Sequence, residues 1–332
     1  MTALTEARVR VIAQEKGFYR ITDGTEIKTA VVSGKFRFEA ARASDFPTVG
    51  DYVLVRQSEN DGNAVIESLF PRKSIFVRRA AGKGSGEQAV AANIDTVFIC
   101  MSLNENYNLR RLERYLSVAY DSGAEPVIIL TKADLCNDTE SAVREARRIA
   151  PGVDVIAISS LDGAYREIKR FISPGKTAAF LGSSGVGKST LINKLAGAEL
   201  IVTRETGNGG KGRHTTTHRE LITLPDGAFV IDTPGMRELG MWDSGEGIET
   251  AFSDIEELTK KCRFSNCTHT SEPGCAVTAA LKLGTLDTDR WKSFLMLKSE
   301  NDFSDDRIGC LDAKREKFKK IAKINKMRGK MN

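Results

Sequence analysis

The sequence predicts a multidomain α/β protein in which a small β-barrel precedes a doubly wound sheet and a helical region follows. Short segments that alternate apolar and polar residues fill roughly the first 70 positions. From residue 96 onward, apolar strands alternate with amphipathic helices, which is typical of a mostly parallel sheet. From about residue 240 the chain is helical and charged, with a cluster of cysteines. A length of 332 residues fits two or three such domains.

Composition and charge narrow the class of protein. Hydrophobic residues make up 41% and charged residues 28%, as in ordinary soluble globular proteins. The formal net charge is +5, but residues 314–330 hold nine basic residues and one acidic residue, so the rest of the chain is slightly acidic. A basic tail of this kind indicates a polyanionic partner. No apolar run is long enough to span a membrane, and no signal peptide is visible, so we expect a cytoplasmic protein.

The first domain is expected over residues 1–75. Five or six short strands in about 65 residues fit an OB-fold barrel, a common nucleic-acid-binding module. A barrel that serves only as a spacer or docking surface remains the alternative. The strands are expected at 9–13, 18–22, 26–34, 35–40, 51–56 and 64–70. The basic segment 71–88 is interpreted as a flexible linker.

The second domain is expected over residues 76–240 and the third over 241–332. Strands are predicted at 96–102, 126–134, 153–160, 177–184, 219–225 and 228–235. Helices between them are predicted at 109–123, 139–149, 163–172 and 188–197. Strands separated by helices imply a doubly wound, mostly parallel sheet.

A phosphate-binding loop follows one of these strands. Residues 182–189 match G-x-x-x-x-G-K-[ST], with an apolar strand before them and a helix after them. Backbone N–H groups of such a loop surround phosphate oxygens, and the helix N-terminus adds favourable charge. Lys188 would neutralise the β- and γ-phosphates, and Ser189 would ligate Mg²⁺. The candidate residues are Gly182, Ser183, Ser184, Gly185, Val186, Gly187, Lys188, Ser189 and Thr190.

Two further segments complete a predicted phosphate site. Asp232 and Gly235 form a D-x-x-G motif at a strand end, where the carboxylate can hold Mg²⁺ through water and the Gly235 N–H can sense the γ-phosphate. Residues 206–218 form a Gly-rich, basic, hydroxyl-rich loop that we expect a ligand to order. Thr216 is the favoured second Mg²⁺ ligand there, with Thr215 and Thr217 left open.

A base-recognition motif precedes the phosphate loop. Thr131, Lys132, Ala133 and Asp134 resemble the guanine-specific N-K-x-D motif, with Thr in place of Asn. The Asp134 carboxylate can accept hydrogen bonds from guanine N1–H and its amine, a donor pair that adenine lacks. Ser159 and Ser160 resemble the S-A element whose N–H groups meet the guanine oxygen. An ATPase or kinase is the alternative if Asp134 does not contact the base.

The order of these motifs is rotated relative to common GTPases. Here the base-recognition motifs come before the phosphate loop and D-x-x-G. The sequence therefore predicts a circularly permuted P-loop GTPase domain.

A metal-ligand pattern lies in the third domain. Cys262, Cys267, His269 and Cys275 supply three thiolates and one imidazole within fourteen residues. This is a donor set for tetrahedral, structural Zn²⁺, with no open coordination position for catalysis. The alternative to a metal site is three reduced cysteines beside an unrelated histidine.

The combination of barrel, permuted motifs and C-x4-C-x-H-x5-C resembles the RsgA (YjeQ) family of ribosome-dependent GTPases over nearly the whole chain. The resemblance implies a GTPase that assists late maturation of the 30S ribosomal subunit, contacts 16S rRNA and is stimulated by the subunit. It places the family's proposed catalytic histidine at His214, in a G-R-H-T-T-T segment. Met236 follows D-x-x-G and cannot orient water as the Gln of Ras does, so intrinsic turnover should be slow. His214 could instead bind phosphate or RNA.

The basic tail supports an RNA partner. Phe318, Ile321 and Ile324 recur at helical spacing among lysines, which suits a helix on rRNA better than one on anionic lipid. This preference argues against membrane contact. We also expect a monomer, with one Zn²⁺ ion per chain and with Mg²⁺ bound together with GTP. The competing interpretation is an RNA-binding module in which the GTP site only gates affinity.

Overall fold

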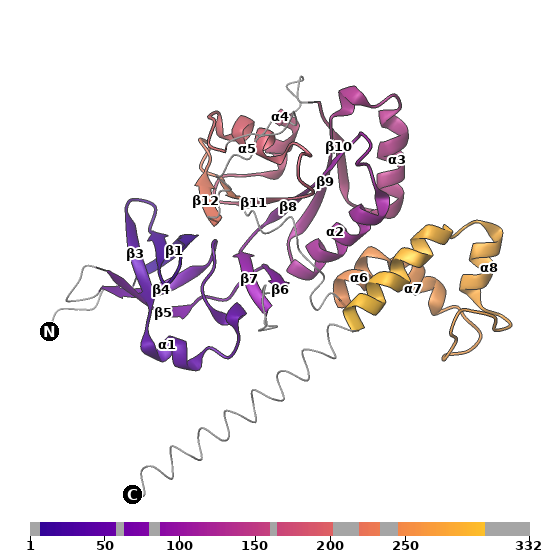
Figure 1. Ribbon diagram of the computed structural model, residues 1–332, viewed down its shortest axis with the longest axis horizontal. Helices are drawn as coiled ribbons and strands as arrows, with labels where there is room; N and C mark the ends of the chain where they lie inside the picture. Colours follow the sequence, from indigo (N-terminus) through magenta and orange to yellow (C-terminus); the bar gives the residue numbers. More distant parts are fainter. Residues whose placement is uncertain are drawn as a thin grey trace, which may run out of the picture.

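The computed structural model describes residues 7–57, 63–79, 87–159, 165–201, 219–232 and 245–302. Figure 1 shows three parts: a barrel of the N-terminal strands, a central sheet with helices on both faces, and a group of C-terminal helices beside α2. No helix within these described ranges is long and apolar enough to cross a bilayer.

Five N-terminal strands close into a barrel. They are β1 (Ala7–Gln14), β2 (Tyr19–Thr22), β3 (Ile27–Val32), β4 (Tyr52–Gln57) and β5 (Ala64–Leu69). They pair in the order β1-β2-β3-β5-β4, and β4 pairs back to β1. Only β3 and β5 run parallel among these pairs. The inward side chains, including Val11, Val53 and Ile66, are fully buried. The predicted small barrel is confirmed, with the strand number of an OB-fold.

Two predictions for the N-terminal region are wrong. Residues 35–40 form helix α1 (Gly34–Glu39) rather than a strand, because the Ser33 hydroxyl accepts a hydrogen bond from the Phe36 N–H and caps the helix. The segment expected as a flexible linker contains β6 (Ile75–Arg79), which pairs antiparallel with β7 (Glu87–Ala92). Phe76 of β6 is buried, so this hairpin belongs to the packed structure.

Arg72, three residues before β6, binds residues of the barrel region through its guanidinium. Its guanidinium donates two hydrogen bonds to the Asp51 carboxylate, at 2.8 and 2.7 Å, and two more to the carbonyls of Ser44 and Phe46. Asp51 has no exposed surface and also accepts a hydrogen bond from the Thr48 N–H. Loss of any of these donors would leave the buried carboxylate incompletely paired and would lower the stability of the fold.

The central sheet has the predicted doubly wound form. Its strands are β8 (Thr96–Ser102), β9 (Glu125–Thr131), β10 (Asp154–Ala157), β11 (Thr177–Leu181), β12 (Arg219–Thr223) and β13 (Phe229–Asp232). The order is β10-β9-β8-β11-β13-β12, and only β12 runs antiparallel to its neighbour. β12 also pairs with β1, so the barrel and the central sheet are hydrogen-bonded to each other. Arg10 is buried at this junction, where it donates to Thr177 and lies over the Phe229 ring.

Helices cover both faces of the sheet, because successive side chains of the fully buried strand β8 enter two different cores. Val97, Ile99 and Met101 join one core with α2 (Leu109–Ser122) and α3 (Thr139–Ile149). Phe98 and Cys100 join the other core with α4 (Tyr165–Ile168) and α5 (Lys188–Ala196). Because both faces are buried, β8 is a continuous apolar run rather than an alternating one. Short 3₁₀ turns lie at Ala43–Asp45, Ala133–Leu135 and Lys169–Phe171.

The C-terminal helices dock on the side of α2 that faces away from the central sheet (Figure 1). They are α6 (Gly245–Ala251), α7 (Ser253–Thr259), α8 (Ala276–Leu283) and a further helix whose described part covers 288–302. Gly247 lies so close to α2 that a Cβ would overlap the Ser117 carbonyl oxygen, and its N–H donates to Asp121 at 2.7 Å. Arg290 of the last helix bonds the buried Glu113 of α2 at 2.8 Å.

Replacing Arg72 with alanine should lower the free energy of unfolding by about 3 kcal/mol, because it leaves the buried Asp51 carboxylate without its cation. The matched control is Arg56→Ala, which breaks a half-exposed pair with Glu67 and should cost less than about 1 kcal/mol. Urea unfolding followed by circular dichroism measures both values. Equal losses in the two variants would show that the Asp51–Arg72 pair has no special role.

Candidate nucleotide site and metal centre

The predicted phosphate-binding loop lies between β11 and α5. Gly182 directly follows β11 with a φ of +150°, and a Cβ at this position would collide with the Cys100 carbonyl oxygen on β8. The loop can therefore pass this close to β8 only with glycine at its first position. Helix α5 starts at Lys188, so its unpaired N-terminal N–H groups face the loop.

Lys188 folds back onto the loop. Its ammonium donates to the carbonyl oxygens of Gly182 and Ser183, both at 2.6 Å. This holds the positive charge beside the backbone that the motif assigns to phosphate binding. Ser184 and Gly185 are exposed, and Val186 is buried in the core under α5. The loop is thus anchored at Val186 and open to solvent at its tip.

Thr131 ties the base-recognition motif to the phosphate loop. This buried residue ends β9, and its hydroxyl donates to the carbonyl of Val186 at 2.7 Å. Thr has one hydroxyl where the Asn of the usual motif has an amide, and this hydroxyl makes the link. The hydrogen bond is short, and the hydroxyl also lies 3.4 Å from the Met101 carbonyl.

Asp134 and Ser159 lie together although 25 residues separate them. The Ser159 hydroxyl donates to the Asp134 carboxylate at 2.6 Å, and the Ala133 N–H bonds the Ile158 carbonyl. Lys132 between the two motif ends adopts a left-handed φ of +57°. Asp134 is exposed, so its second oxygen can meet a ligand. This arrangement can accept two neighbouring N–H donors of a base.

Several candidate residues cannot be placed. Ser160, His214, Thr216 and Gly235 lie outside the described residues, as do the alternatives Thr215 and Thr217 and the basic tail. The backbone of Asp232 ends β13, next to the phosphate-loop strand β11, but its side chain is not described. The functions proposed for all these residues stay predictions.

Sequence reasoning missed two residues of α2 that reach the phosphate loop. The Arg111 guanidinium donates to the Ser183 hydroxyl at 3.1 Å, and the Tyr115 hydroxyl lies 3.4 Å from the same oxygen. The only sequence signal is that the two residues are four positions apart, on one face of a helix. No motif connects them with the loop, because the contact spans about 70 positions of the chain.

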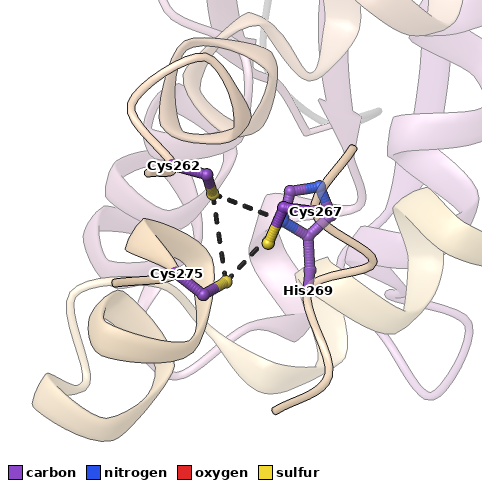
Figure 2. A group of neighbouring side chains, drawn as sticks. All are labelled: Cys262, Cys267, His269 and Cys275. Carbon is purple, nitrogen blue, oxygen red and sulfur yellow. Dashed lines mark hydrogen bonds between the residues drawn. The ribbon is translucent and has the colours of Figure 1, made fainter. Parts of the chain in front are cut away.

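The cysteine–histidine cluster is assembled by the end of α7, a loop and the start of α8. Figure 2 shows Cys262, Cys267, His269 and Cys275 pointing toward a common centre. All four ligand atoms lie within 4.8 Å of one another. The Cys262 and Cys275 sulfurs are 3.9 Å apart, and His269 Nδ1 lies 3.4 and 3.7 Å from them. A zinc tetrahedron with ordinary Zn–S and Zn–N bonds has edges of about 3.6 to 3.8 Å, so the cluster fits.

The surroundings of Cys262 and Cys275 donate hydrogen bonds that favour thiolates, whereas burial raises the pKa of Cys267 to about 11. The Ala276 N–H points at the Cys262 sulfur and the Thr278 N–H at the Cys275 sulfur, both at 3.4 Å. Burial raises the pKa of Cys275, but hydrogen bonds from Thr278 and His269 outweigh it and lower the pKa to about 6. The His269 ring stands edge-on to Trp291, with centroids 5.8 Å apart. Cys275 also caps α8, where the helix dipole favours negative charge.

Comparisons with known proteins agree with this architecture. A family model described as RsgA GTPase matches residues 69–242, just over half of the chain. A small ribosomal subunit biogenesis GTPase, RsgA 2 of Lactiplantibacillus plantarum, is 47% identical over 88% of this chain and 82% of its own.

Two solved structures extend the likeness to the fold. YjeQ from Thermotoga maritima has a TM-score of 0.65 at 25% identity, covering 89% of this chain and 98% of its own. YloQ, described as a circularly permuted GTPase, has a TM-score of 0.63 at 27% identity, covering 92% and 98%. The motif order and strand order described above therefore identify a circularly permuted GTP hydrolase, and the chain belongs to the RsgA GTPase family.

Proposed function

We propose that this GTPase binds the 30S ribosomal subunit, assists its late maturation and hydrolyses GTP to GDP and phosphate under stimulation by the subunit. The observation that carries the proposal is the joined guanine and phosphate site, Asp134 with Ser159 and Thr131 with Val186, in a chain closely similar to a small ribosomal subunit biogenesis GTPase.

Guanine selection would rest on Asp134. One carboxylate oxygen accepts a hydrogen bond from Ser159, which orients the group, and the carboxylate then accepts from N1–H and the exocyclic amine of guanine. Adenine presents no such donor pair and would leave a polar group unpaired. Ser160 is proposed to meet the guanine oxygen through its backbone N–H, and the Lys132 stem to cover the base.

Phosphate binding would use residues 182–190. Ser189 and Thr216 are proposed to hold the Mg²⁺ that accompanies GTP, with Asp232 acting through water and Gly235 at the γ-phosphate. When bound, Mg²⁺ neutralises charge on the β- and γ-phosphates. Lys188 already rests on the loop and would exchange its carbonyl partners for phosphate oxygens.

Hydrolysis requires a group that orients water, and Met236 cannot do this. We propose His214 for the role, since a positioned imidazole can accept a proton from water near neutral pH. Thr216 lies two residues further along the chain, so both groups are proposed to lie at the γ-phosphate when GTP is bound.

Contact with 16S rRNA is proposed through the barrel and the basic tail. On α1 Phe38 is 83% exposed and directly follows the exposed Arg37, and Lys35 is exposed on the same short helix. An exposed aromatic ring next to cations is suited to stacking on an unpaired base. The protein is proposed to act as a monomer in the cytoplasm, where its ribosomal partner is found.

One structural Zn²⁺ ion is proposed at Cys262, Cys267, His269 and Cys275. The four donors and their spacing support the assignment, and they leave no vacant position for a substrate. The ion would join the end of α7 to the start of α8 and would stabilise the C-terminal helices that dock on α2.

Turnover of GTP should be slow alone, rise sharply with 30S subunits and be unaffected by 50S subunits, with no hydrolysis of ATP. His214→Ala should lower the 30S-stimulated kcat about a hundredfold or more, as expected for loss of a general base. His218→Ala, in the same segment, is the matched control. Phosphate release measures all of these rates. A flat rate with both subunits would favour the alternative of an RNA-binding module with incidental hydrolysis.

Thr131→Val should weaken binding of both GDP and a non-hydrolysable GTP analogue about fivefold to tenfold, because the Val186 carbonyl loses its donor while side-chain volume is kept. Thr29→Val, on an exposed strand of the barrel, should leave affinity unchanged. Fluorescent-nucleotide titration gives the dissociation constants. Unchanged affinity in Thr131→Val would show that the link to the phosphate loop is not needed for binding.

Cys267→Ser should reduce bound zinc from about one ion per chain to nearly none after dialysis, and should lower the thermal midpoint, because three ligands hold the ion poorly. Cys136→Ser, a half-buried cysteine outside the cluster, should retain the metal. Atomic emission and thermal unfolding report the two quantities. Zinc retained in full by Cys267→Ser would refute the assignment of this ligand.

A further inference from the structure

Helix α2 approaches the phosphate-binding loop from the side opposite to α5. Arg111 and Tyr115 lie on one face of the helix, and both meet the Ser183 hydroxyl, at 3.1 and 3.4 Å. Ser183 is the second residue of the phosphate-binding motif, and its carbonyl accepts from Lys188. Ser183 therefore binds the Arg111 guanidinium through its side chain and the Lys188 ammonium through its backbone carbonyl.

Arg111 is presented by a rigid helix. The Asn108 side chain caps α2 by accepting from the Arg111 N–H at 3.0 Å, and Leu112 and Leu116 are buried against the sheet. A second face of α2 carries the C-terminal helices, because Glu113 bonds Arg290 and Arg114 bonds Glu300. Because α2 is held on both of these faces, the position of the Arg111 backbone is set independently of the loop.

The charge of Arg111 is directed at the loop. Within the described part of the chain, the Ser183 hydroxyl is the side-chain partner of its guanidinium. Arg110 and Arg114, the other arginines of this helix, are bound to the carboxylates of Glu113 and Glu300. A guanidinium that is bound to a neutral hydroxyl keeps its full charge available to a nearby anion, and a half-buried position screens it less than an exposed one.

We propose that Arg111 is a positioning residue for the phosphates of GTP and GDP. Its hydrogen bond to Ser183 holds the start of the phosphate-binding loop in the shape that surrounds phosphate oxygens, and its charge adds to that of Lys188. The di- and triphosphate both gain from this, since both occupy the loop. Arg111 contributes to binding of the nucleotide in its ground state and leaves the water-activating step to other residues.

The test compares Arg111→Ala, Arg111→Lys, Ser183→Ala and the double variant Arg111→Ala/Ser183→Ala in the full chain. Fluorescent GDP and a non-hydrolysable GTP analogue give dissociation constants. Arg111→Ala should weaken both nucleotides about fivefold to tenfold and raise the KM for GTP by a similar factor, with kcat within about twofold of wild type. Arg111→Lys, which keeps the charge and one donor, should recover most of the loss.

The double variant tests whether the two residues act through their contact. If they do, Arg111→Ala/Ser183→Ala should bind nucleotide no more weakly than Arg111→Ala, whereas independent effects would add. Arg144→Ala, an exposed arginine of α3 that pairs with Glu140, is the matched control and should bind as wild type does. Circular dichroism melting should be unchanged in Arg111→Ala, since this side chain is only half buried.

Four results would overturn the proposal. The first is nucleotide affinity within twofold of wild type in Arg111→Ala. The second is the same loss of affinity in Arg111→Lys as in Arg111→Ala, and the third is additive losses in the double variant. A fall in kcat without a change in KM would count against it equally, because it would place Arg111 in the chemical step.

Discussion

The parallel pairing of β8, β9, β10, β11 and β13 is the constraint on which the rest of the structure depends. Parallel strands bring their carboxyl ends to one edge of a sheet, where ligands of doubly wound folds bind. Thr131, Ser159 and Gly182 each follow or end one of these strands, so they lie near one another in space although they are distant in sequence. The order of the motifs along the chain is therefore free to change. A circular permutation keeps the site because it keeps the sheet.

Helix α2 connects the nucleotide site with the C-terminal helices. It touches the phosphate loop through Arg111, and nearly opposite, about 160° around the helix axis, Glu113 binds Arg290 within a buried interface. Gly247 allows α6 to pack directly on its backbone. The cysteine–histidine cluster lies on this same C-terminal group, so a metal there would stiffen the helices that hold α2. The sheet, α2 and the metal centre thus form one continuous packed unit.

The misassigned segments show the limit of local patterns. Residues 35–40 alternate aromatic and polar side chains like a strand, but a capping serine and one buried aromatic residue make them a helix. The basic segment after the barrel is rich in glycine and charge, which indicated a linker. Its first half pairs with β7, and Arg72 just before β6 binds the buried Asp51 carboxylate. The first error comes from a local capping hydrogen bond that the alternating pattern does not reveal, and the second from partners distant in sequence, which outweigh local propensity.

Motif spacing was enough to predict a guanine-nucleotide site, the permuted order and the metal-ligand set, and the patterning of apolar residues was enough to predict the barrel and the parallel sheet. These features are readable because each needs particular residue types at short, fixed separations. Spacing could not show that the Thr131 hydroxyl reaches Val186, that Ser159 orients Asp134, or that Arg111 lies against Ser183. Each of those contacts joins residues 25 to 72 positions apart. Strand pairing in the sheet brings the first two pairs within hydrogen-bonding distance, and the packing of α2 against the sheet brings the third. Both are decided by the whole core.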